Sequence, residues 1–249
     1  MTLLAEDPEW WDTVFPESVA QIRFVKRTIR RADRRILDVG CATGFLCASL
    51  RRGGVTAAGI DINSRFIIAA RAKDPGGEYY VGNMRTFRMK GTFDLLTCLG
   101  TTFSYNLTNG DIAKSLRNFG RHLTPGGRVV IDVLNAVAFA GPRPFAPQTQ
   151  HSFMRNGVPA VASIKHRLHL KDQCMSEQVS WKLGGKPLRR DPAERQRLFF
   201  PQELSFHLEV AGFSGVKLLD SYGRSSDAFD GRRLIAIATL ARKHSSQIK

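Results

Sequence analysis

The chain has 249 residues, of which 43% are hydrophobic and 24% are charged, a composition typical of a globular protein with a buried core. No apolar run reaches the roughly 20 residues that a membrane-spanning helix needs, and the acidic, aromatic N-terminus is unlike a secretory signal peptide. We therefore expect a cytoplasmic protein with no membrane partner. The cysteines form no CxxC pair, which predicts buried thiols in a reducing compartment and no metal site.

The formal net charge is +15, and the basic residues gather in 23–35 and 182–197. A positive field attracts anions, whether phosphorylated small molecules, nucleotides or nucleic acid. The first basic run also carries Ile22, Val25 and Ile29 at helical spacing, so it fits the solvated face of a helix. Aromatic residues are not interleaved with either run, which disfavours a groove for single-stranded nucleic acid.

In chain order, helical patterns alternate with continuous apolar runs as far as Asn135. We expect helices at 17–31, 44–52, 63–72 and 108–122, strands at 36–40, 55–62, 78–83, 93–100 and 128–135, and a turn at 124–127. Apolar strands between helices predict a doubly wound α/β fold whose mostly parallel sheet is buried on both faces. Such sheets bind ligands beyond the carboxyl ends of their strands.

The pattern changes after Asn135. Residues 136–157 are rich in Pro, Gly and Ala and are expected to be irregular, whereas 158–171 and 174–183 alternate on either side of a turn. The alternation predicts an inserted antiparallel β-hairpin lid. A helix at 201–213 and strands at 215–222 and 232–241 complete the chain.

The most informative motif is LDVGCATGF, Leu37 to Phe45. A strand that ends in Gly40, followed by Ala42 and then Gly44 at a helix start, leaves room for a ligand to approach the backbone. Asp38, just before the first glycine, can accept a hydrogen bond from a cationic amine and would repel a pyrophosphate. The loop therefore favours the amino-acid part of S-adenosylmethionine over NAD.

Two further strand ends carry polar side chains. Asp61 follows the glycine loop at the end of the second strand, where a carboxylate can hold both hydroxyls of a ribose. Capping of the next helix is its structural alternative. Asn83 and Met84 end the third strand, where an amide can meet an adenine edge and a thioether can pack on the ring.

These residues, with TPGGRVVIDV, resemble the class I S-adenosylmethionine-dependent methyltransferases over roughly 36–135. The Asp-x-Gly-x-Gly-x-Gly loop of that family stands here as Asp38, Gly40, Ala42 and Gly44. The resemblance implies a Rossmann-like, mostly parallel seven-stranded sheet and S-adenosyl-L-methionine as cofactor, with S-adenosyl-L-homocysteine as product. The cofactor-binding residues that it implies are Asp38, Gly40, Cys41, Ala42, Gly44, Asp61, Ile62, Asn83, Met84, Cys98, Leu99 and Gly100.

A closer resemblance is to the nucleotide-sugar amine N,N-dimethyltransferases of antibiotic biosynthesis. VGNMRTF (81–87) is similar to the Gly-Asp-Met-Arg-x-Phe segment of that group, and LFFPQEL, AGF and GRRLIAI follow its order. The implied organisation is 1–35 as N-terminal lid and helix, 36–135 as S-adenosylmethionine-binding core, 136–198 as inserted loop and β-hairpin acceptor lid, 199–242 as C-terminal helix and strands that complete the core, and 243–249 as a tail.

Methyl transfer to an amine needs alignment and the loss of one proton, so the sequence carries no fixed catalytic signature. Tyr105 is our candidate catalytic residue because it follows the fourth strand at the carboxyl edge of the sheet. The candidates for substrate binding are Trp11, Tyr105, Asn135, His166 and Tyr222. His166 and His169 lie three apart on a predicted strand and so face opposite sides of it.

We expect a small-molecule acceptor that is methylated at nitrogen. If the acceptor is anionic, Lys165, Arg167 and Lys171 on the hairpin would steer it toward the site. We expect the protein to be a monomer or a homodimer. The alternatives are O- or C-methylation of a small molecule, a non-catalytic binding protein, and an RNA methyltransferase, which only the basic charge favours. The loop CLGTTFSY contains no NPPY or Pro-Cys motif. Its sequence therefore disfavours the adenine, glutamine and C5-cytosine methylation that use those devices, and a nucleic-acid partner is disfavoured.

Overall fold

The computed structural model describes residues 1–16, 18–140, 146–222 and 231–242, so the predicted tail at 243–249 lies outside the described residues. The elements in chain order are α1 (Leu3–Glu6), α2 (Pro8–Val14), α3 (Val19–Thr28), β1 (Arg35–Val39), α4 (Phe45–Arg52), β2 (Thr56–Asp61), α5 (Ser64–Lys73), β3 (Glu78–Val81), β4 (Phe93–Cys98), the 3-10 helix η1 (Thr102–Tyr105), α6 (Asn109–Arg121), β5 (Leu123–Asn135), α7 (Ala136–Ala140), β6 (Gln148–Arg155), β7 (Val158–His169), the 3-10 helix η2 (Leu170–Asp172), β8 (Cys174–Leu183), β9 (Lys186–Arg190), β10 (Glu194–Phe199), α8 (Pro201–Val210), β11 (Phe213–Leu219) and β12 (Arg233–Leu240). None of these helices is both long and apolar enough to cross a membrane.

The core sheet runs in the order β3-β2-β1-β4-β5-β12-β11. Its first five strands pair in parallel, whereas β12 runs antiparallel to β5, and β11 antiparallel to β12. The predicted doubly wound, mostly parallel α/β fold is confirmed. The whole sheet has 12 strands within the described residues rather than seven, because the inserted strands join it.

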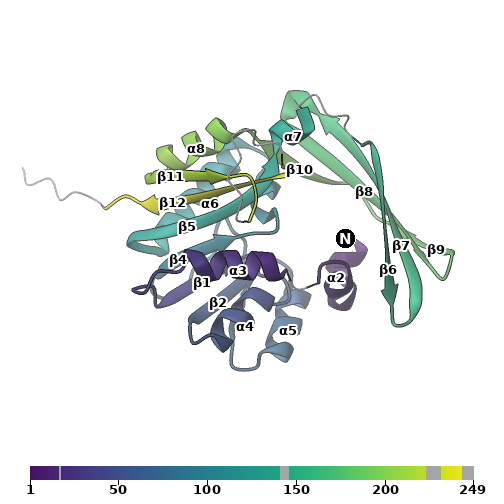
Figure 1. Ribbon diagram of the computed structural model, residues 1–249, viewed down its shortest axis with the longest axis horizontal. Helices are drawn as coiled ribbons and strands as arrows, with labels where there is room; N and C mark the ends of the chain where they lie inside the picture. The colour runs from purple at the N-terminus through teal and green to yellow at the C-terminus, as the bar shows by residue number, and fades with distance from the viewer. Residues whose placement is uncertain (17, 141–145, 223–230, 243–249) are drawn as a thin grey trace, which may run out of the picture.

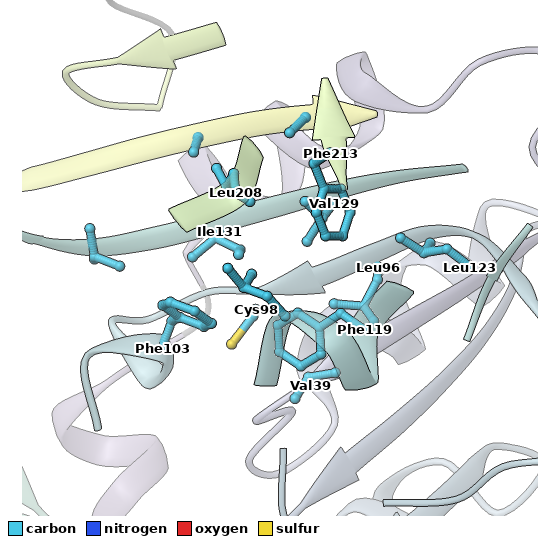
Figure 2. Close-up of a cluster of buried hydrophobic side chains, with 14 of the residues drawn as sticks. Val39, Leu96, Cys98, Phe103, Phe119, Leu123, Val129, Ile131, Leu208 and Phe213 are labelled. Carbon is cyan, nitrogen blue, oxygen red and sulfur yellow. The ribbon is translucent and has the colours of Figure 1, made fainter. Parts of the chain in front are cut away.

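Helices cover both faces of the core sheet (Figure 1). On one face α3, α4 and α5 bury Phe24, Leu50 and Ile67 in one apolar cluster. On the other face α6 and α8 bury Phe119 and Leu208 in a second cluster, drawn in Figure 2. Because both faces are covered, the sheet exposes its edges and the ends of its strands, and a ligand must bind there.

The inserted segment forms the lid sheet, which we define as β6 to β10. Here β7 pairs antiparallel with both β6 and β8, and β8 also pairs antiparallel with β9 and β10. The end of β10 then joins the core, where Leu198 and Phe199 pair in parallel with Leu134 and Asn135 of β5. The predicted hairpin is present as β7 and β8, but it is the centre of a larger sheet that stands beside the core (Figure 1).

One sequence-based expectation about local structure was wrong. Residues 136–157 are not irregular throughout, because they contain α7 and β6, and the eight residues of β6 pair with β7 along their whole length. At 124–127, where a turn is predicted, β5 departs from regular pairing with β4: Leu123 lies opposite Phe93 and Arg128 opposite Leu95, and Gly126 takes a φ of 83°. Two helices, α1 and α2, precede the predicted first helix.

Candidate active site

The loop between β1 and α4 has a backbone that requires small residues. Gly40 and Gly44 have φ angles of 78° and 81°, in the left-handed region that favours glycine. A Cβ at Gly40 would lie 2.4 Å from Cγ2 of Thr102, and one at Gly44 would lie 2.7 Å from Cε1 of Tyr79. Ala42 has a φ of 46°, so it adopts the same kind of conformation as the glycine it replaces. The loop lies at the carboxyl end of β1, as the motif predicts.

Asp61 ends β2, and its carboxylate braces the glycine loop. Oδ2 accepts a hydrogen bond from the Ala42 amide at 3.0 Å, and Oδ1 accepts one from the Asn63 amide at 2.8 Å. Burial raises the pKa of Asp61, although these backbone bonds oppose the rise. The next residue, Ile62, is 68% exposed. A carboxylate and an exposed apolar side chain therefore stand together beside the loop.

Asp38 is a buried acid directly before the glycine loop. Its Oδ1 accepts a hydrogen bond from Oγ1 of Thr97 at 2.7 Å. Burial raises the pKa of Asp38 to about 7, and the negative charges of Asp61 and Asp132 add to the rise. A ligand cation at this end of β1 would favour the ionised carboxylate.

Asn83 and Met84 follow β3 and shape the turn after it. Oδ1 of Asn83 accepts a hydrogen bond from the Arg85 amide at 2.9 Å. Sδ of Met84 accepts one from Nδ2 of Asn106 at 3.2 Å, and the side chain packs against the core. Both side chains therefore have contacts within the protein.

The three residues at the end of β4 and just after it, Cys98 to Gly100, change from buried to exposed. Cys98 lies in the apolar cluster with Phe103 and Phe119 (Figure 2), and burial raises the pKa of its thiol. The residue is fully buried. Leu99 is also buried, whereas Gly100 is exposed, and a Cβ there would meet no atom within 4 Å.

Tyr105 ends η1 and is 42% exposed. Its hydroxyl donates to Oε2 of Glu194 at 3.2 Å, and its carbonyl accepts a hydrogen bond from Arg85 at 2.7 Å. Loss of solvation and the Glu194 carboxylate raise the pKa of Tyr105 above its ordinary value. Sequence reasoning missed Glu194, because it lies in the basic run 182–197.

Tyr222 bonds to a carboxylate that the sequence analysis also missed. Its hydroxyl donates to Asp132 and accepts a hydrogen bond from Gln21 at 3.1 Å. Asp132 is fully buried in β5, where it also accepts bonds from the Thr101 amide and from Arg233. Burial raises its pKa and the Arg233 charge opposes the rise. The sequence feature that could have indicated Asp132 is that it is the single charged residue in the apolar run VVIDV. Tyr222 thus supports the loop after β4.

Asn135 is fully buried at the end of β5. Its Nδ2 donates to the Gly231 carbonyl at 2.8 Å, and its Oδ1 accepts a hydrogen bond from the Val137 amide at 3.1 Å. The side chain therefore fixes the passage from β5 into α7.

His166 lies on β7 in the lid sheet. Its Nδ1 is 3.1 Å from Oε1 of Glu177, and its Nε2 is 2.9 Å from Oγ1 of Thr149. Burial lowers the pKa of His166. His169 instead contacts Ser176 at 3.0 Å, on the other side of the strands, as the spacing of the two histidines predicts.

The helix α2 lies between the core and the lid sheet (Figure 1). Trp10 packs against Trp181 of the lid, with ring centroids 5.5 Å apart, while Trp11 packs against Phe66 of α5 at 5.0 Å. Asp12 accepts a hydrogen bond from Oγ1 of Thr43 in the glycine loop at 2.6 Å. The predicted substrate residue Trp11 is thus on the core side of a helix that connects the two sheets.

The described residues contain no group of three or more His, Cys, Asp or Glu side chains arranged to hold a metal ion. Asp38 directly precedes the glycine loop, and Asp61 accepts a hydrogen bond from it. They suit a ligand with an amine and hydroxyl groups.

Residues 36–127 match the family model described as a methyltransferase domain. The chain is 34% identical over 106 residues to the dTDP-4-amino-2,3,4,6-tetradeoxy-D-glucose N,N-dimethyltransferase of Saccharopolyspora spinosa, an alignment that covers 43% of each protein. The chain thus spans less than half the length of this curated relative, and the same holds for two dTDP-3-amino-sugar N,N-dimethyltransferases of Streptomyces fradiae and Streptomyces venezuelae.

Solved structures extend the similarity to most of the chain. The sugar N-methyltransferase KedS8 from Streptoalloteichus is 21% identical with a TM-score of 0.77, covering 94% of this chain and 92% of that one. The CcbJ methyltransferase from Streptomyces caelestis is 20% identical with a TM-score of 0.76, covering 89% and 88%. At these identities the structures establish the fold. Within this fold, residues 36–127 are the part that matches the methyltransferase domain model.

Proposed function

We propose that the chain is an S-adenosylmethionine-dependent methyltransferase that acts on the nitrogen of a small-molecule amine, with a nucleotide-linked amino sugar as its acceptor class. The observation that carries this proposal is the edge of the methyltransferase domain, where the glycine loop, Asp38 and Asp61 lie together. The names of the relatives, which describe N,N-dimethylation of dTDP-linked amino sugars, support the acceptor class.

The cofactor is assigned to this edge. The Asp61 carboxylate would accept hydrogen bonds from the ribose hydroxyls, and the Asp38 carboxylate would accept one from the amino group. Exposed Gly100 leaves room beside the end of β4. When bound, S-adenosylmethionine supplies a methyl group on a positively charged sulfur and leaves as S-adenosylhomocysteine. The other residues assigned to the cofactor edge are Gly40, Cys41, Ala42, Gly44, Ile62, Asn83, Met84, Leu99 and the backbone of Cys98.

The acceptor is assigned to the side of the edge that faces the lid sheet. An amine held in line with the methyl group gains about 7–11 kcal/mol of barrier reduction from proximity alone. Tyr105 is the residue that would touch the acceptor, because it follows Gly100 and bonds to the lid. Trp11, Asn135, His166 and Tyr222 are assigned to the walls and supports of the acceptor site.

An anionic acceptor fits the basic chain and the dTDP group in the relatives' names. Lys165 and Arg167 alternate with His166 along β7, so they lie on the opposite face of the lid sheet and would act through their field. We further propose the domain boundaries given above, and a monomer or homodimer with no nucleic-acid partner.

A transfer screen tests this function. The purified chain is incubated with S-adenosylmethionine and one of four acceptors: dTDP-4-amino-2,3,4,6-tetradeoxy-D-glucose, its 4-hydroxyl counterpart, a catechol and bulk tRNA. Release of S-adenosylhomocysteine is followed over time. We expect turnover with the amine and background rates with the other three. Preferential turnover of the hydroxyl sugar, the catechol or the tRNA would replace the amine assignment with O-methylation or RNA methylation.

A further inference from the structure

The lid sheet carries a row of ionisable side chains across three neighbouring strands. His166 of β7 lies opposite Glu177 of β8, and Glu177 lies opposite Glu194 of β10. Residues directly opposite each other in antiparallel pairs point to the same face of a sheet. The three side chains therefore form one polar row, which we call the lid row, on a single face of the lid sheet.

Apolar residues flank the lid row on the same face. Trp181 of β8, four residues beyond Glu177, packs with Trp10 of α2. On the other side, Met175 of β8 and Leu198 of β10 pack with Phe139 of α7. This face is thus covered by α2 at one end and by α7 at the other, and the lid row lies between the two covered parts.

The lid row reaches the core at the loop after β4. The Tyr105 hydroxyl donates to Glu194 at 3.2 Å. Gln196, two residues along β10 and on the same face, donates to Oγ1 of Thr101 at 3.3 Å. Thr101 directly follows Gly100, beside which there is open space. The lid row therefore faces the part of the core to which the acceptor is assigned.

The two carboxylates of the lid row repel each other unless a cation lies between them. Like charges directly opposite on neighbouring strands repel each other. Burial raises the pKa of both Glu177 and Glu194. At Glu194 the hydrogen bond from Tyr105 opposes the rise and the charges of Asp191 and Glu177 add to it, while at Glu177 the charge of Arg232 opposes the rise. Both groups are still reached by solvent, so a ligand can approach them.

We propose that Glu177 and Glu194, together with the Tyr105 hydroxyl, form the subsite that holds the protonated amine of the acceptor and distinguishes it from a hydroxyl group. This inference rests on the proposed function and names the residues that select its substrate class. An ammonium group between the carboxylates offsets their repulsion and donates hydrogen bonds to both, whereas a neutral hydroxyl offers no charge.

The same arrangement gives the amine a route to its reactive form. An ammonium nitrogen has no free electron pair, so it must lose one proton before it can attack a methyl group. That proton passes from the nitrogen to Oε2 of Glu194 and leaves the electron pair on nitrogen. Glu194 becomes a neutral acid and then returns the proton to solvent, which reaches it.

The test compares two acceptors that differ in one group. Binding of dTDP-4-amino-2,3,4,6-tetradeoxy-D-glucose and of its 4-hydroxyl counterpart is measured by calorimetry at pH 7 with S-adenosylhomocysteine present. The proteins are the wild type, the Glu177→Gln, Glu194→Gln double variant, and Glu209→Gln, a control on the exposed surface of α8. Glutamine keeps the size of the side chain and removes its charge, and melting curves check that each variant folds.

We expect the wild type and Glu209→Gln to bind the amine at least about tenfold more tightly than the hydroxyl sugar, as charge-assisted hydrogen bonds predict. The double variant should lose most of this preference with unchanged affinity for the hydroxyl sugar. Equal affinities in the wild type, or an undiminished preference in the double variant, would overturn the inference. If the wild type transfers methyl groups but the double variant keeps its preference for the amine, the proposed function holds and the inference fails. If the preference for the amine depends on the two carboxylates but no methyl group is transferred, only the proposed function is refuted.

Discussion

Replacing Asp61 by alanine should weaken binding of S-adenosylmethionine and of its demethylated product. Asp61 is 9% exposed, and its carboxylate already accepts two backbone hydrogen bonds, so it is held at the end of β2 before a ligand arrives. Removal of a buried carboxylate that two ribose hydroxyls share costs about 1–3 kcal/mol of binding free energy. Since 1.4 kcal/mol corresponds to a factor of ten, affinity should fall by about 5- to 150-fold.

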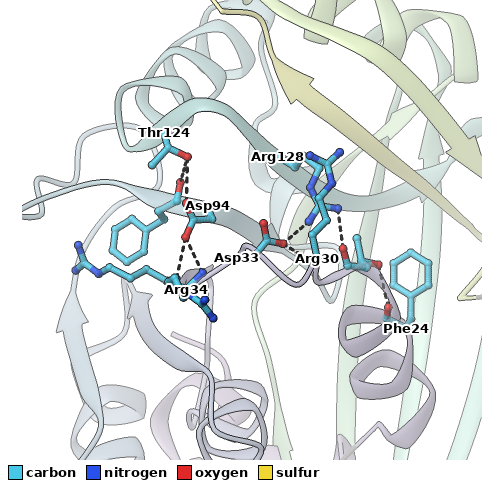
Figure 3. Close-up of polar contacts among 10 residues, drawn as sticks. Phe24, Arg30, Asp33, Arg34, Asp94, Thr124 and Arg128 are labelled. Atoms are coloured by element: carbon cyan, nitrogen blue, oxygen red, sulfur yellow. Dashed lines mark hydrogen bonds and ion pairs between the residues drawn. The ribbon is translucent and has the colours of Figure 1, made fainter.

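The variant also loses the bonds to the Ala42 and Asn63 amides, so its stability will fall as well. Asp94→Ala is a matched control, because Asp94 accepts bonds from the Arg34 and Arg35 amides at 2.7 and 3.0 Å (Figure 3). It lies at the start of β4, where the parallel strands begin, whereas Asp61 lies where they end.

Calorimetric titration with S-adenosylhomocysteine, alongside melting curves, separates the two effects. Both variants should melt at lower temperature than the wild type, and only Asp61→Ala should lose affinity. Wild-type affinity in Asp61→Ala would remove this residue from the cofactor site. An equal loss in Asp94→Ala would show that the loss reflects stability alone.

Two further predictions concern Asp38 and the N-terminal helices. The raised pKa of Asp38, about 7, exceeds its unfolded value, so its contribution to stability is present below about pH 4 and is lost as pH rises through 7. At pH 6 the carboxyl group of Asp38 in the free protein is protonated, and binding of the cofactor amino group should release this proton. Calorimetric titrations with the cofactor in buffers of different ionisation enthalpy should detect the release in the wild type but not in Asp38→Asn. Deletion of residues 1–16 should leave the core folded but depress turnover, because it removes the contact of Trp10 with Trp181. Trp181 is then the one tryptophan of the three that remains, and because it loses its packing against Trp10 its fluorescence should shift to the red. Unchanged emission with full turnover would contradict a role of the N-terminal helices in joining the lid to the core.

The core could be predicted from the sequence because its strands are short apolar runs buried on both faces. The predicted strand at 36–40 and the observed β1 differ by one residue at each end. The lid was predicted less completely. β6 reads QTQHSFMR, and most of its residues are polar, so its extended structure depends on pairing with β7 rather than on local pattern.

The candidate site was likewise predicted in its core part but not in its lid part. Asp38, Gly40, Gly44 and Asp61 follow from spacing, because residues at the ends of parallel strands must meet at one edge. Glu177 and Glu194 could not be placed beside Tyr105 without the strand register, since the two glutamates are 17 positions apart in the chain and an additional strand lies between them.

Transfer of an isotope-labelled methyl group tests the proposed function most directly. The chain is incubated with S-adenosylmethionine that carries a trideuterated methyl group and with dTDP-4-amino-2,3,4,6-tetradeoxy-D-glucose, and tandem mass spectrometry locates the label. We predict one or two trideuteromethyl groups on the sugar nitrogen. Label on oxygen or carbon, or no label on a protein that binds both compounds, would contradict the assignment of this chain as an amine N-methyltransferase.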